Sequence, residues 1–73
     1  MKQVILAGAG IMGASLTQVY ALAGWETVLY NRSLSGLQRA ETLIRLNQKA
    51  LMAADILTEE QSAAMWHHIQ MTT

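Results

Sequence analysis

The 73-residue sequence contains no cysteine and no proline, and only 14% of its residues are charged. Without cysteine, neither a disulfide framework nor a thiolate metal site is available to stabilise the small core of such a short chain. Apolar residues make up 52% of the sequence, which is typical of a globular chain and not of a disordered one. No apolar run reaches the roughly 20 residues that cross a bilayer, so we expect no membrane contact.

The charges sum to zero, but they are unevenly spread along the chain. Segment 32–49 carries four basic residues and one acidic residue, whereas segment 55–60 carries three acidic residues. Glu41 precedes Arg45 by four residues, which is the favourable order for a helical ion pair, so a solvated helix face explains the basic segment; contact with an anionic ligand is the alternative. So small a basic excess, with no interleaved aromatic residues, argues against nucleic-acid binding.

A glycine-rich motif follows the apolar run Val4 to Ala7 and precedes a segment with helical periodicity. In a strand, turn and helix arrangement, the first glycine of GxGxxG allows a tight turn, the second lets the backbone approach a pyrophosphate, and the third packs against the strand. The backbone N–H groups of the first helical turn then form an anion site. The alternative is a turn that serves only close packing. The predicted dinucleotide-binding residues here are Gly8, Ala9, Gly10, Ile11, Met12 and Gly13.

The first half of the chain predicts a βαβ unit. Residues 2–7 should form a strand buried on both faces, because its apolar residues, Val4 to Ala7, run continuously instead of alternating with polar ones. A helix of about three turns should follow and end at Gly24, and segment 25–30 should form a second strand parallel to the first. The residues expected to pack this helix on the sheet are Met12, Leu16, Val19, Tyr20 and Ala23.

The second half predicts a long helical hairpin. Ser33 should cap a helix that runs to about Ala54, and a capping box of Thr58 and Gln61 should start another helix that ends near Ile69. The apolar stripe of the first of these helices consists of Leu37, Ala40, Ile44 and Leu51. Residues 71–73 stand where a third strand would begin. We therefore expect an α/β fold, an incomplete Rossmann unit in which the outer edge of the first strand has no partner.

That unpaired edge predicts that the chain aggregates, exchanges elements with a second copy, or forms part of a longer protein. Only Met1-Lys2-Gln3 precede the apolar run of the first strand, which leaves no room for a signal peptide, so a cytoplasmic location, or a matrix location after processing, is expected.

Several segments together resemble the 3-hydroxyacyl-CoA dehydrogenases. They are the glycine motif, residues 18–29 (QVYALAGWETVL), the helical hairpin, and Leu57-Thr58-Glu59-Glu60 ahead of Thr72-Thr73. The resemblance covers essentially all 73 residues and implies that 1–73 is the N-terminal part of an NAD(P)-binding domain. It further implies a helical dimerisation domain, a homo-oligomer, and hydride transfer between a nicotinamide coenzyme and a 3-hydroxyacyl-CoA. The catalytic His and Glu pair of the family lies outside these residues, so no catalytic residue is assigned here.

The end of the second predicted strand departs from the family pattern. NAD-binding domains usually carry an acidic residue about 20 positions beyond the glycine motif, where it binds the ribose hydroxyls. Asn31 stands there, followed by Arg32 and Ser33, an ending similar to that of NADP-dependent 3-hydroxyisobutyrate and 6-phosphogluconate dehydrogenases. Without the carboxylate, a 2′-phosphate is not repelled and Arg32 could bind it, which slightly favours NADP. Alternatively, Arg32 points to solvent and Asn31 accepts one ribose hydrogen bond.

The remaining polar residues give weaker indications. The resemblance implies acyl-CoA contacts along the hairpin, for which Asn47 and Lys49 are candidates. The alternative is that both side chains face solvent. His67 and His68 are expected at the surface, without further ligands for a metal ion. Two other functions remain open: an NADP-dependent short-chain hydroxyacid dehydrogenase, and a non-catalytic dinucleotide-binding or assembly module.

Overall fold

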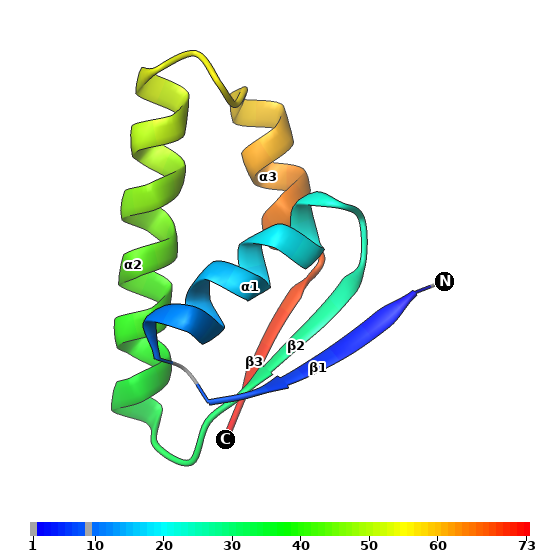
Figure 1. Ribbon diagram of the computed structural model, residues 1–73, viewed down its shortest axis with the longest axis vertical. Helices are drawn as coiled ribbons and strands as arrows, with labels where there is room; N and C mark the ends of the chain where they lie inside the picture. The colour runs from blue at the N-terminus through cyan, green and yellow to red at the C-terminus, as the bar shows by residue number, and fades with distance from the viewer. Residues whose placement is uncertain (1, 9) are drawn as a thin grey trace.

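The computed structural model describes residues 2–8 and 10–73 of the chain. The elements follow in the order β1 (Gln3–Ala7), α1 (Ile11–Leu22), β2 (Glu26–Tyr30), α2 (Leu34–Ala53), α3 (Glu59–His67) and β3 (Ile69–Thr72). Helices and strands alternate up to α2, after which α3 folds back beside it and leads into β3 (Figure 1). The expected α/β class and the helical hairpin after the second strand are therefore confirmed.

The described residues form a three-stranded sheet in the order β1-β2-β3, with both pairs of strands parallel. Ala7 pairs with Tyr30, and Tyr30 pairs with Thr72, so the carboxyl ends of all three strands lie at one edge of the sheet. β3 is a strand of four residues, where the sequence predicted only the start of one. The edge at which residues leave the strands and enter α1 and α2 is where a Rossmann fold places its ligand.

The core lies between the sheet and the helices, which occupy one side of the sheet (Figure 1). Leu29 of β2, Ile44 of α2 and Met65 of α3 are all almost fully buried. α1 lies against the sheet and also contacts both α2 and α3. One helical layer on one face is what right-handed crossovers produce when consecutive strands are added in the same direction.

The expectation that β1 is buried on both faces was wrong. Exposed and half-buried residues alternate along the strand, and Ile5 is 68% exposed. The reason is the single helical layer: Val4 and Leu6 lie half-buried, whereas no element of the described residues covers Ile5. A continuous apolar run is compatible with this arrangement, because the sequence does not reveal which face is covered.

The expected packing stripe of α1 was also wrong. Met12 is 76% exposed and Val19 is 62% exposed, whereas the buried face carries the small or polar residues Ala14, Thr17 and Ala21. Such residues permit a close approach between helix and sheet that larger side chains would prevent. Tyr20 instead packs against Trp25 with the two rings tilted by 57° and 5.1 Å between their centroids.

The predicted helix boundaries agree closely with the structure. Gly24, with a φ of 87°, follows the C-cap of α1, as expected for a glycine that ends a helix. Thr58 and Gln61 form the predicted capping box of α3. Glu41 and Arg45 pair at 3.5 Å on an exposed face of α2.

Two details of the hairpin differ. α3 ends at His67, so Ile69 belongs to β3, and Leu51 at the end of the α2 stripe is only half-buried. Across the described part of the chain, no helix has both the length and the hydrophobicity that crossing a membrane requires.

Candidate functional site

The turn between β1 and α1 is constrained at its first and last glycines. Gly8 donates its backbone N–H to the carbonyl oxygen of Tyr30 at 2.8 Å, which extends the strand ladder, and its φ of +100° suits glycine. A Cβ on Gly13 would overlap the carbonyl oxygen of Gly8. Both glycines are therefore required by the chain itself, one for backbone conformation and the other for close packing of the helix on the turn.

Gly10 has no comparable internal requirement. Its φ of −73° and ψ of −173° are extended values that other residues adopt, and a Cβ at this position would meet nothing within 4 Å. The residue is exposed at the edge where β1 and β2 end. The fold does not demand a glycine at this position, and the space beside it is open. A phosphate-binding turn needs such a glycine, because a ligand can then approach the backbone closely. The turn therefore leaves the backbone at Gly10 open to close approach by a ligand.

The N-terminus of α1 is suited to an anion. Gly10 is the N-cap of α1. Among the described residues, no side chain caps this helix by a hydrogen bond, and its first turn contains no acidic residue. By contrast, α2 is capped by Ser33 and α3 by Thr58, and α3 also carries two glutamates in its first turn. Uncapped N–H groups and the positive end of the helix dipole attract negative charge.

Of the residues predicted at this turn, Ile11 and Met12 begin α1 with side chains 77% and 76% exposed. Their backbone N–H groups, not their side chains, would face a phosphate. Ala9 was also predicted as a coenzyme residue and lies outside the described residues.

The second predicted cluster lies where β2 leaves the sheet beside the glycine turn, because Tyr30 pairs with Ala7. The Asn31 side-chain amide donates to the carbonyl oxygen of Ser33 at 3.0 Å and to Ser33 Oγ at 3.3 Å. Ser33 Oγ in turn accepts the backbone N–H of Gly36 at 3.1 Å. Arg32 lies between these two residues and is exposed. The fold thus brings Asn31, Arg32 and Ser33 to the same edge as the glycine motif.

Sequence reasoning missed Gly36. It is buried in the first turn of α2, and a Cβ there would overlap the side-chain amide nitrogen of Asn31. A glycine inside a predicted helix was the available signal, since glycine is unfavourable in helices.

The predicted acyl-CoA residues lie elsewhere, in the second half of α2. Asn47 and Lys49 are both exposed. Asn47 lines a pocket of about 340 Å³ between α1 and α2, together with Ser15, Gln18, Val19, Leu22, Ala50 and Leu51. Lys49 does not line this pocket, so the fold does not bring the two candidates to one cavity.

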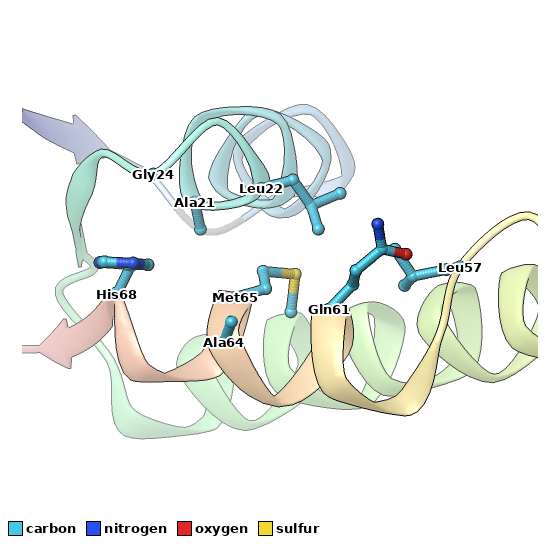
Figure 2. A pocket seen from close by; sticks show the side chains of 8 residues that line it. All are labelled: Ala21, Leu22, Gly24, Leu57, Gln61, Ala64, Met65 and His68. Atoms are coloured by element: carbon cyan, nitrogen blue, oxygen red, sulfur yellow. The ribbon is translucent and has the colours of Figure 1, made fainter.

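A separate pocket of about 310 Å³ lies between α1 and α3 (Figure 2). Ala21 and Leu22 of α1 face Met65 and Gln61 of α3 across it. None of the predicted coenzyme residues lines this pocket.

The two histidines differ in their surroundings. His67 is exposed, whereas the half-buried His68 donates from Nδ1 to Glu26 Oε1 at 2.9 Å. Among residues 2–8 and 10–73, no cluster of three or more histidine, aspartate or glutamate side chains is placed to hold a metal ion.

A parallel strand, a glycine turn and an uncapped helix in this order define the chain as a Rossmann-type α/β unit of the nucleotide-binding class. The sequence model described as "3-hydroxyacyl-CoA dehydrogenase, NAD binding domain" matches residues 3–73, and the chain belongs to this family. A search of curated protein sequences found no match.

Solved structures agree with this assignment. (S)-3-hydroxybutyryl-CoA dehydrogenase PaaH1 from Ralstonia eutropha superposes with a TM-score of 0.95 at 26% identity, over 100% of this chain and 26% of that protein. 3-Hydroxybutyryl-CoA dehydrogenase from Escherichia coli K12 gives a TM-score of 0.92 at 28% identity, over 99% and 15% of the two chains. FadB2 from Mycobacterium tuberculosis has the same fold, with a TM-score of 0.93 at 22% identity over 99% and 25%. The chain thus spans about a quarter or less of the length of these proteins.

Proposed function

We propose that the chain binds the pyrophosphate and adenosine ribose of a nicotinamide dinucleotide, as the N-terminal part, residues 1–73, of a 3-hydroxyacyl-CoA dehydrogenase-like NAD(P)-binding domain. The observation that carries the proposal is the contrast among the three glycines. Gly8 and Gly13 are explained by the fold, whereas Gly10 has open space around it and an ordinary backbone conformation. Close approach of a phosphate gives the residue at position 10 a reason to lack a side chain.

Each residue of the site has a defined part in this proposal. Gly10 admits the pyrophosphate to the backbone, and the N–H groups of Ile11, Met12 and Gly13 supply donors from the uncapped start of α1. Asn31, Arg32 and Ser33 lie at the adenosine ribose. When bound, the nicotinamide ring accepts or donates the hydride. No residue of this chain is assigned a catalytic role, and His67 and His68 lie away from the glycine turn.

NAD is the coenzyme that the family favours. A slight preference for NADP stays a prediction, motivated by the absence of a carboxylate at Asn31 and by the exposed guanidinium of Arg32. If the prediction is right, NADPH binds more tightly than NADH. Equal or tighter binding of NADH would remove the role of Arg32.

For a complete protein, the proposed reaction is hydride transfer between the coenzyme and a 3-hydroxyacyl-CoA. Asn47 and Lys49 stay candidates for contacts with the CoA moiety. Replacing Lys49 by glutamate is expected to weaken acyl-CoA binding by reversing a charge, and unchanged affinity would dismiss the residue. The cytoplasmic location and the homo-oligomer also stay predictions.

A non-catalytic dinucleotide-binding or assembly module is the second candidate. It is favoured by the outer edge of β1, which has no partner strand among the described residues. A stable compact monomer in sedimentation would count against association through this edge. The NADP-dependent short-chain hydroxyacid dehydrogenase considered at first does not agree with the family to which the chain belongs.

Titration of the 73-residue chain with NADH and NADPH, followed by coenzyme fluorescence or calorimetry, tests the proposal. We expect saturable binding of at least one coenzyme with one site per chain. Gly10→Val provides the matched comparison, because a branched side chain at that position blocks the approach of a phosphate to the backbone. Undiminished binding by the valine variant, or no binding by the parent chain, would overturn the proposal.

A further inference from the structure

The side chain of Asn31 bridges across Arg32. Its amide donates to the backbone carbonyl and to the hydroxyl of Ser33, so the residue between them is the centre of a closed turn. The backbone N–H of Asn31 donates to the carbonyl oxygen of Thr72 at 3.1 Å, which also ties this turn to β3. We refer to Asn31, Ser33 and Gly36 together as the Asn31 lock.

Gly36 makes the lock possible. A Cβ at this position would overlap Asn31 Nδ2 and would lie 3.1 Å from Ser33 Oγ. Its φ is not positive, since the positive values among the described glycines belong to Gly8 and Gly24. Glycine is less favourable than alanine inside a helix, and here the compensating feature is the space that it leaves for the Asn31 amide.

In the lock, an amide at position 31 has a function that the acid usually found there in NAD-binding domains could not perform. Asn31 Nδ2 faces the carbonyl oxygen of Ser33 at 3.0 Å as a donor. An ionised aspartate in the same rotamer would direct an acceptor oxygen at that carbonyl and could not close the turn. The amide at position 31 thus supplies a donor to Ser33 that an ionised carboxylate lacks.

We infer that Asn31 and Gly36 are positioning residues that hold Arg32 at the adenosine ribose, where its guanidinium recognises a 2′-phosphate. The inference rests on the proposed function and adds the means by which this site distinguishes nucleotides. Two features support it. Arg32 is exposed while the backbone on both sides of it is fixed by the lock, and a guanidinium offers a fork of donors suited to phosphate.

The test compares adenosine 5′-monophosphate with adenosine 2′,5′-bisphosphate, which differ only in the 2′-phosphate, by calorimetry on the 73-residue chain. We expect the parent chain to bind the bisphosphate more tightly. Arg32→Ala should weaken bisphosphate binding about tenfold and leave the monophosphate unchanged. Asn31→Ala and Gly36→Ala open the lock in independent ways, and each should lose a similar share of the bisphosphate affinity.

The mechanism also predicts non-additive effects. In the Arg32→Ala background, opening the lock should cause no further loss of bisphosphate affinity, because the residue that it positions is already absent. Monophosphate binding reports that each variant is folded. If Gly36→Ala misfolds and binds neither nucleotide, the Asn31→Ala/Gly36→Ala variant replaces it in the test. In that variant the Cβ at position 36 no longer overlaps the Asn31 amide.

Two results would overturn the inference while leaving the proposed function intact: a parent chain that binds the monophosphate at least as tightly as the bisphosphate, or an Asn31→Ala variant with undiminished preference for the bisphosphate. Failure of the parent chain to bind NADH, NADPH and both nucleotides would instead overturn the proposed function.

Discussion

Gly13 lies so close to Gly8 that a Cβ on Gly13 would overlap the Gly8 carbonyl oxygen. We therefore expect Gly13→Ala to lower the free energy of unfolding by about 1–3 kcal/mol, the usual cost of overpacking, despite the higher helix propensity of alanine. Gly10→Ala is the matched control and should change stability by less than about 1 kcal/mol, because its Cβ enters open space. Urea denaturation measures both, and equal stability of the two variants would contradict this account of the turn.

A second prediction concerns the buried amides that join α1 and α2. Gln48 Nε2 donates to Gln18 Oε1 at 2.8 Å, and Gln48 Oε1 has no partner within the part of the chain that the structure describes. Gln48→Leu leaves the acceptor of Gln18 unsatisfied and should cost about 1–3 kcal/mol. The Gln18→Leu/Gln48→Leu double variant should cost less than the sum of the single changes. Strictly additive losses in a denaturation cycle would show that the hydrogen bond does not couple the helices.

At the end of α2, a substitution is expected to raise the stability of the chain instead of lowering it. Asp55 has a φ of 58°, and its backbone N–H donates to Met52 as the chain leaves the helix. Glycine adopts this left-handed conformation without a steric cost, so Asp55→Gly should stabilise the chain by up to about 1 kcal/mol. Asp55→Ala should destabilise it, since alanine lacks both the freedom of glycine and the polar side chain. Thermal unfolding distinguishes the two, and a glycine variant less stable than the parent would refute the argument.

The capping box of α3 is expected to contribute measurably to the free energy of unfolding. Thr58 Oγ1 accepts the N–H of Gln61 at 3.1 Å, and Gln61 Oε1 accepts the N–H of Thr58 at 2.9 Å. Thr58→Ala removes the first bond and should cost about 1 kcal/mol. Thr42→Ala is a control of the same residue type, since Thr42 lies exposed within α2 and its hydroxyl donates to the carbonyl oxygen of Gln38 in the same helix. If both changes have the same effect on the unfolding free energy, the cap makes no special contribution.

Local signals in the sequence predicted the local structure well. Ser33, Thr58 with Gln61, and Gly24 each mark a helix end through a specific hydrogen bond or backbone conformation, and the structure has each of them in that role. Such interactions span a few residues and do not depend on the rest of the fold. The glycine motif was informative for the same reason, because its spacing reflects a single turn.

Tertiary burial was harder to predict. The exposed Ile5, Met12 and Val19 read as core residues, but the described residues cover only one face of the sheet. Hydrophobic periodicity identifies an apolar side without stating which element covers it. The contact between Gly36 and Asn31 was missed because a glycine in a helix signals that space is needed without naming the neighbour that needs it.

The most direct test of the central claim is an NMR titration of the isotopically labelled chain with NADH, in which the backbone amide signals are followed. We expect the largest shifts on the N–H signals of Gly10, Ile11, Met12 and Gly13, with a second group at Asn31 and Arg32. Binding of NADH at the glycine turn would be contradicted by saturable binding in which the signals of the turn do not shift and the largest shifts fall on residues that line the pocket between α1 and α3.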